Sequence, residues 1–131
     1  MIARGLERAL AVGATVLVPL ALRLLPLPAV FALCDRWPGV ALSPRTPAQL
    51  ANRVRRWLAH GRGPWTSSCL TRSLVLYALL RQHGYQPRFV VGVAGTAHDF
   101  DAHAWVTLDD TPVADAPDVS GAYTPLLSHC A

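Results

Sequence analysis

Residues 67–84 constrain the fold more than any other segment, because they predict a single buried helix that begins beside a cysteine. Ser67 or Ser68 can accept the unpaired amide protons of a helix start, and Gly84 suits the left-handed position that commonly ends a helix. Between them, leucine, valine, tyrosine and alanine cover almost the whole circumference, which is typical of a helix buried on all sides. Cys69 is therefore expected in the first turn of a central helix.

A cysteine at that position is a candidate nucleophile. The positive end of the helix dipole favours the thiolate, which is the reactive form, and Arg72 one turn later can add to the effect. The structural alternative stays open, because a lone cysteine in an apolar helix is more often a small core residue.

Composition limits the class of protein. The chain has 131 residues, enough for one domain with a modest core, and with 52% hydrophobic and 15% charged residues it is too apolar to be disordered. The net charge of +4 rests on arginine without any lysine, which we interpret as compositional bias. No basic block alternates with aromatic residues, so we expect no nucleic-acid binding. Three irregularly spaced cysteines argue against a disulfide framework and favour a reduced, cytoplasmic setting.

Residues 1–33 are the most apolar part of the chain. The uncharged run from Ala9 to Leu22 is shorter than the roughly 20 residues of a membrane-spanning helix, and prolines interrupt any longer span. Leucine spacing predicts one or two hydrophobic helices that pack on the domain or on a partner. A signal peptide and contact with the inner face of the membrane are the alternatives. We divide the chain into a hydrophobic helical extension, residues 1–45, and a core, residues 46–131.

The remaining elements follow from caps and periodicity. Thr46 opens a helix with a proline at its first position and a glutamine that completes a capping box. Leucine, valine and Trp57 form the buried stripe of that helix. The period then changes to two, which predicts strands at residues 86–93, 100–108 and 111–116. The predicted fold class is α+β, with helices first and a small antiparallel sheet after them.

The two later strands carry a possible catalytic pair. A hairpin loop centred on Asp109 would set His103 directly opposite Asp115, so that the carboxylate could orient the imidazole. If the helix of Cys69 packs across that face, thiol, imidazole and carboxylate form a nucleophile, a base and an orienting group for acyl transfer. Asp101, on the same strand face as His103, is the alternative partner.

Other ionisable residues show no comparable pattern. Cysteine, histidine and aspartate can also ligate zinc, but no CxxC or HxxxH spacing is present and a fourth ligand is missing, so we expect neither a metal nor another cofactor. The remaining cysteines and histidines have no matching partners, and we interpret them as structural or surface residues: Cys34, His60, His83, His98, His129 and Cys130.

Three motifs together resemble those of the lasso peptide leader peptidases, the transglutaminase-like cysteine proteases of lasso peptide biosynthesis. The motifs are Cys69-Leu-Thr-Arg-Ser-Leu, Phe100-Asp-Ala-His103-Ala-Trp-Val and Pro112-Val-Ala-Asp115, within residues 46–116. The resemblance implies a papain- or transglutaminase-like core with Cys69 as nucleophile, His103 as base and Asp115 as orienting residue.

The resemblance also implies a function and partners. This family removes the leader from a ribosomally made (RiPP) precursor peptide, so that a separate lasso cyclase can use the freed amine. In the split form, a small RiPP recognition element protein brings the leader to the peptidase. The chain shows no leader-binding domain ahead of its hydrophobic helices, so it resembles the split form. The expected partners are the precursor peptide, the recognition protein and, less directly, the cyclase.

The oxyanion donors and two other functions stay open. The Cys69 amide is the first expected donor. The Trp65 indole is a candidate for the second, and Trp105 could shield the imidazole or line the substrate groove. Ordinary packing is the equal alternative for both. The same core could instead transfer an acyl group to an amine. A non-catalytic peptide-binding module would have a Cys69 that is alkylated only at alkaline pH.

Overall fold

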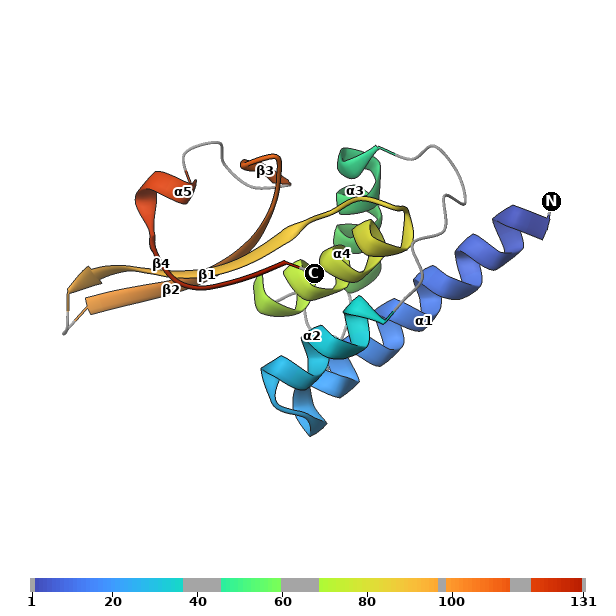
Figure 1. Ribbon diagram of the computed structural model, residues 1–131, viewed down its shortest axis with the longest axis horizontal. Coiled ribbons are helices and arrows are strands. Elements are labelled where there is room, and N and C mark those ends of the chain that lie inside the picture. Colours follow the sequence, from blue (N-terminus) through green and yellow to red (C-terminus); the bar gives the residue numbers. More distant parts are fainter. Residues whose placement is uncertain (1, 37–45, 60–68, 97–98, 114–118, 131) are drawn as a thin grey trace.

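The computed structural model describes residues 2–36, 46–59, 69–96, 99–113 and 119–130. Within these ranges, some side chains lie outside the description, namely those of residues 2–8, 10, 11, 14, 69, 96, 100, 119 and 120. The elements in chain order are α1 (Ile2–Leu24), α2 (Leu27–Asp35), α3 (Pro47–Leu58), α4 (Cys69–Gln82), β1 (Arg88–Thr96), β2 (Asp99–Leu108), β3 (Thr111–Val113), α5 (Val119–Ala122) and β4 (Thr124–Cys130). Helices α1 to α4 precede a four-stranded antiparallel sheet, and the short α5 lies between its last two strands, which confirms the predicted α+β class (Figure 1).

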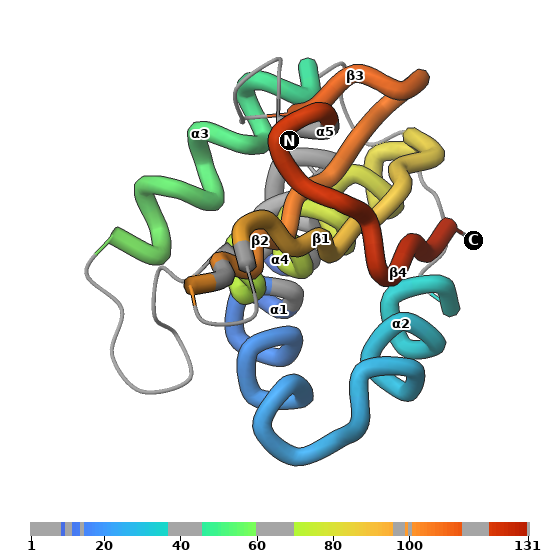
Figure 2. Tube along the Cα trace, turned by 90° about the vertical axis from the view of Figure 1, so that its left-hand side faces the viewer, coloured from blue at the N-terminus to red at the C-terminus, as the bar shows by residue number. Residues whose placement is uncertain are grey.

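Two hydrophobic helices, α1 and α2, form the N-terminal part of the fold, as the leucine spacing predicts. Helix α1 continues through Pro19 without a break. Figure 2 shows the two helices as a hairpin on one side of α4. Val18, Val30, Phe31 and Cys34 are buried and join the main core, so the N-terminal helices cover the domain.

The outer surface of α1, α2 and the turn between them is apolar. Large hydrophobic side chains are exposed there: Val12, Val16, Leu17, Leu20, Leu24, Leu25 and Leu33. None of the described helices combines the length and hydropathy that crossing a membrane requires. Membrane contact through residues 1–33 and the division of the chain after residue 45 stay predictions.

Helix α3 begins with the predicted capping box. The Thr46 hydroxyl accepts from the Gln49 amide at 3.2 Å, and the Gln49 side chain accepts from the Thr46 amide at 3.0 Å. The buried face of α3 consists of Leu50, Ala51, Val54 and Leu58. Trp57 was expected in this stripe but is 37% exposed, with the Arg53 guanidinium 5.3 Å from the centre of its ring.

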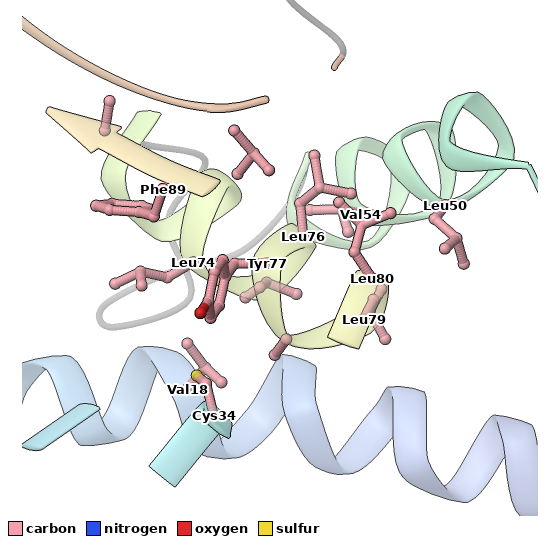
Figure 3. Close-up of a cluster of buried hydrophobic side chains, with 14 of the residues drawn as sticks. Val18, Cys34, Leu50, Val54, Leu74, Leu76, Tyr77, Leu79, Leu80 and Phe89 are labelled. Atoms are coloured by element: carbon pink, nitrogen blue, oxygen red, sulfur yellow. The ribbon is translucent and has the colours of Figure 1, made fainter. Parts of the chain in front are cut away.

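Helix α4 is the centre of the main core. Every residue from Leu74 to Leu80 is at most 5% exposed, because α1, α2, α3 and the sheet surround the helix (Figure 3). The helix ends as predicted, with Gly84 at a φ of +85°. The Tyr85 amide donates to the Leu80 carbonyl at 3.0 Å and the Gly84 amide to the Arg81 carbonyl at 3.1 Å, a Schellman ending.

The sheet has the order β3-β2-β1-β4, and the long β1–β2 hairpin projects beyond the helices (Figure 1). Strand β4 pairs with β1 and forms one edge of the sheet. No pattern in the sequence predicted this strand. Nearly every residue of β4 is exposed, so no alternation of buried and exposed positions marks this strand in the sequence. Pro125 also lies within it, and proline is unusual inside a strand.

Candidate active site

Cys69 is the first residue of α4, the position that the sequence predicts. Its side chain lies outside the described residues, so the backbone alone places it. Ser73 follows four residues later, and residues four apart lie on the same face of a helix. The face of α4 that begins with Cys69 is therefore the face that carries Ser73.

Ser73 fastens that face of α4 to strand β2. Its hydroxyl donates a hydrogen bond of 2.9 Å to the Ala104 carbonyl oxygen, and the side chain is buried. Ala104 is the residue after His103. The helix of the candidate nucleophile and the strand of the candidate base are thus joined one turn from Cys69 and one residue from His103.

His103 is half-buried and packs beside two aromatic rings. The centre of its imidazole lies 5.9 Å from the Trp105 ring, with 20° between the planes, and 5.3 Å from the Tyr123 ring. Gly92 is the residue opposite His103 on β1. A Cβ atom at Gly92 would lie 2.9 Å from Cη2 of Trp105 and 3.0 Å from Cβ of Tyr123, so this aromatic packing requires glycine.

Helix α4 does not pack across the strand face that carries His103, which corrects the sequence-based expectation. Ala104 and Val106 belong to the main core with α4, whereas Trp105 lies in a smaller cluster on the opposite face. The physical reason is the alternation of β2: its small and apolar residues occupy the face opposite His103, and the apolar surface of α4 is buried against them. His103 meets α4 at the edge of the sheet instead, around a cavity described below.

The third strand begins at Thr111 as predicted, but the register of the β2–β3 hairpin differs from the one expected for a loop centred on Asp109. Asp109 and Asp110 form a two-residue turn with positive φ angles of 49° and 64°, the geometry that matches the twist of hairpin strands. Leu108 therefore pairs with Thr111. A loop centred on Asp109 would have paired Leu108 with Asp110, so the predicted register is wrong by one residue.

The position of Asp115 is not decided by this hairpin. Strand β3 is described only to Val113, which pairs with Val106, so the described part of the ladder does not include His103. Asp115 and the rest of the predicted third strand lie outside the described residues. The role of Asp115 as the partner of His103 stays a prediction, and the register of the described hairpin does not support it.

Asp101, the alternative partner of His103, forms a hydrogen bond with another residue, Tyr123. The Tyr123 hydroxyl donates a hydrogen bond of 2.7 Å to Oδ2 of Asp101. Tyr123 therefore contacts both the imidazole of His103 and the carboxylate two residues before it. Tyr123 was not among the candidate residues, because no element was predicted beyond the third strand. Its only signal in the sequence is that it is an aromatic residue in a polar tail.

A cavity of about 270 Å³ lies where α3, α4 and the edge of the sheet meet. His103 and Trp105 border it from β2, Ser73 and Arg72 from α4, and Arg55 from α3. The remaining lining residues are uncharged: Ala48, Ala51, Asn52, Val54, Leu76, Ala104 and Val113. The cavity is therefore basic, and it adjoins both the candidate base and the first turns of the candidate nucleophile's helix.

Of the two candidate substrate-binding tryptophans, only Trp105 belongs to the described residues. Trp65 lies outside the described residues. Trp105 is 2% exposed and covers one side of the His103 ring, and its indole N–H meets no acceptor among the described residues. Packing accounts for most of the Trp105 surface, and a substrate-binding role for either residue stays a prediction.

A second polar cluster, centred on Asp35, joins three distant parts of the chain. Oδ1 of Asp35 accepts a hydrogen bond of 2.8 Å from the Tyr77 hydroxyl, and Oδ2 lies 2.7 Å from Nε2 of His129. Arg81 donates to the Asp35 backbone carbonyl at 3.2 Å, and the His129 ring stacks on Phe31 at 4.2 Å. His129 therefore has a structural role, which agrees with its interpretation from the sequence as a structural or surface residue. The sequence did not show its partner, because α2 and β4 meet only in the folded chain.

This cluster contains no reactive nucleophile. Burial, and then the neighbouring Asp35 carboxylate, raise the pKa of Cys34 from 9.0 to about 12. Burial and the hydrogen bond to Asp35 likewise raise the pKa of Tyr77 well above its ordinary value. Both side chains are therefore neutral at physiological pH, and Cys34 has a structural role.

The other described cysteines and histidines offer no further site. Cys130 is exposed, and a ring nitrogen of buried His83 lies 2.9 Å from the Leu79 carbonyl oxygen. His60 and His98 lie outside the described residues. In the part of the chain that the structure describes, which excludes the Cys69 side chain, no three metal-ligating side chains come together.

Comparison with profiles of protein families matches residues 14–128 to the transglutaminase-like superfamily. The matched segment contains every residue of the candidate triad and runs from within α1 into β4. Neither the comparison with curated proteins nor the comparison with solved structures gives a match.

Proposed function

We propose, because the chain belongs to the transglutaminase-like superfamily, that it is a cysteine peptidase that removes the leader from a lasso precursor peptide. Members of this superfamily are generally similar to cysteine proteases or acyltransferases. The observation that carries the proposal is the hydrogen bond from Ser73 to Ala104, which holds the start of α4 against the strand of His103. The motif resemblance around Cys69, His103 and Asp115 supports the choice of substrate.

The proposed reaction has two steps. His103 takes the thiol proton of Cys69, and the thiolate attacks the carbonyl carbon of the scissile amide. The C–N bond breaks as His103 returns the proton to the leaving amine, and the leader stays attached as a thioester. Water then attacks the thioester while His103 accepts its proton, which releases the leader carboxylate and restores the thiol. Asp115 would orient the imidazole, and the Cys69 amide would stabilise the oxyanion.

Delivery of the leader is part of the proposal. A separate RiPP recognition element protein binds the leader and brings it to the peptidase in the cytoplasm, where the precursor is made. The lasso cyclase then uses the freed amine. Resemblance to the split form of the leader peptidases supports this arrangement.

Mass spectrometry of a cleavage reaction tests the function. The precursor peptide encoded beside this gene is incubated with the full chain, with and without the neighbouring recognition protein. Cys69→Ala and His103→Ala are the test variants. Cys130→Ser is the matched control, because Cys130 is exposed and distant in sequence from the candidate triad.

We expect one cut at the leader–core junction, faster with the recognition protein, retained in Cys130→Ser and lost in both test variants. A leader fragment with a free carboxyl group indicates hydrolysis, whereas a leader joined to an added amine would identify an acyltransferase. Normal turnover in Cys69→Ala would refute the proposed nucleophile. Absence of any cut, with all proteins folded and the peptide bound, would support a non-catalytic peptide-binding module.

A further inference from the structure

We propose that the cavity between α3, α4 and β2 is a specificity pocket that binds an acidic side chain of the substrate peptide. The inference rests on the proposed function, because it assigns a substrate feature to the same site. The cavity is bordered by His103 and by the second turn of α4, so a side chain that enters it belongs to a residue near the scissile bond.

Charge is the first argument. Arg55 and Arg72 border the cavity from two different helices, and none of the described residues that line it is acidic. Arginine suits a carboxylate ligand, because a guanidinium group donates paired hydrogen bonds to it with favourable geometry. An uncharged or basic side chain would leave both cations without a counter-charge.

The state of Arg72 is the second argument. It is only partly exposed, and no described acidic side chain forms an ion pair with it. Arg81, at the other end of the same helix, shows the usual arrangement, since it lies 3.8 Å from the Asp35 carboxylate. A partly buried arginine without a carboxylate partner is favourable for ligand binding, because the ligand supplies the charge that offsets its desolvation.

The shape and lining of the cavity give the third argument. Its volume of about 270 Å³ is slightly below the ~300–1,000 Å³ of small-molecule sites, so it suits one side chain. Alanine, valine and leucine form much of the lining and can cover the methylene groups of a glutamate. Asn52 accepts a hydrogen bond of 2.8 Å from the Arg55 guanidinium, which orients that group before a ligand binds.

A cleavage assay tests the pocket within the proposed reaction. The full chain is incubated with mixtures of acetylated, amidated octapeptides in which one position at a time is fixed as Glu or as its neutral isostere Gln. At one position near the cut, we expect Glu to raise kcat/KM by ~10- to 100-fold over Gln, which is the range for hydrogen bonds to charged groups. Arg72→Gln and Arg55→Gln should reduce this preference, whereas Arg56→Gln, which changes an exposed arginine of α3 outside the cavity, should keep it.

The same assay separates specificity from activation of the thiol. If Arg72 only stabilised the Cys69 thiolate, Arg72→Gln would slow Glu and Gln peptides equally and shift the pH profile of Cys69 alkylation. Selective loss with Glu peptides and an unchanged alkylation profile supports the pocket. Equal rates for Glu and Gln at every position, or a preference that survives in Arg72→Gln, would overturn it.

A binding measurement distinguishes failure of the pocket from failure of the proposed function. In the Cys69→Ala protein, the arginine Nε–Hε signals are followed by NMR during titration with N-acetyl-glutamate methylamide or N-acetyl-glutamine methylamide. We expect saturable shifts of the Arg72 and Arg55 signals with the glutamate probe alone. Such shifts without cleavage of any peptide would retain the pocket and refute the peptidase. Cleavage without such shifts would retain the peptidase and refute the pocket.

Discussion

The Ser73 hydroxyl donates a buried hydrogen bond of 2.9 Å to the carbonyl oxygen of Ala104, 31 residues away in the sequence. This bond joins α4 to β2 beside both candidate catalytic positions. A shift of α4 relative to β2 would therefore change the distance between Cys69 and His103.

Replacing Ser73 by alanine is expected to impair catalysis more than folding. Ser73→Ala removes one buried hydrogen bond and should lower the free energy of unfolding by about 1–2 kcal/mol. Because the bond positions α4 against β2, kcat for precursor cleavage should fall by ~10-fold or more. Urea denaturation and cleavage rates measure the two effects, with exposed Ser128→Ala as control. Full activity in a destabilised Ser73→Ala protein would limit this bond to a structural role.

Replacing Gly92 by alanine is expected to disturb the rings around His103. The new methyl group would lie 2.9 Å from the Trp105 ring and 3.1 Å from the Thr124 carbonyl oxygen, so the aromatic cluster must shift. Overpacking of this kind costs about 1–3 kcal/mol of stability, and Trp fluorescence should change with it. Gly121→Ala is the matched control, since no atom lies within 4 Å of its added methyl group. Equal stability of the two variants would contradict the packing described here.

Two aspartates compete as the residue that orients His103, and substitution separates them. If Asp115 has that role, Asp115→Asn should lower kcat by at least ~100-fold, because the imidazole loses its tautomer preference and its stabilising charge. Asp101→Asn, which removes the charge, and Tyr123→Phe, which removes the hydrogen bond of 2.7 Å between these residues, should each lower it by less than ~10-fold. The opposite ranking would assign the role to Asp101, with Tyr123 as its positioning residue.

The Asp35 cluster is expected to stabilise the fold without affecting catalysis directly. Asp35→Ala leaves Tyr77 and His129 without their carboxylate partner and should lower the free energy of unfolding by about 2–3 kcal/mol. Asp99→Ala, which removes an exposed carboxylate, should have little effect on stability. Thermal denaturation of the two variants tests the difference, and similar melting temperatures would rule out the cluster as a stabilising element.

Stability should fall at alkaline pH. Cys34 ionises near pH 9.0 when unfolded and only near pH 12 when folded, and the pKa of Tyr77 is raised from 10.0. The stability that both neutral groups contribute is complete below about pH 9. The Cys34 contribution is lost as the pH rises from about 9 towards 12, and the Tyr77 contribution is lost only above about pH 10, each at ~1.4 kcal/mol per pH unit. Urea midpoints between pH 7 and 11, in reductant, test this. Cys34→Ala should flatten the curve between pH 9 and 10, and Cys130→Ser should not.

The sequence determined the local parts of this protein. The all-apolar helix with Cys69 at its start, the Thr46 capping box, the ending at Gly84 and the period-two strands all arise from short-range propensities, and the structure confirms these elements. Each of these depends on residues within a few positions of one another. The motifs along the chain also pointed to a transglutaminase-like protein, and the match over residues 14–128 confirms that superfamily.

Only the tertiary structure decided which faces meet. The sequence cannot show that the apolar surface of α4 is buried against Ala104 and Val106, on the face opposite His103, or that a two-residue turn shifts the hairpin register by one. Nor can it show that Tyr123 lies beside His103 and that His129 binds Asp35. The physical reason is that packing and cross-strand pairing depend on contacts between residues distant in the chain. Those contacts are selected by the burial of the whole apolar surface rather than by any local pattern.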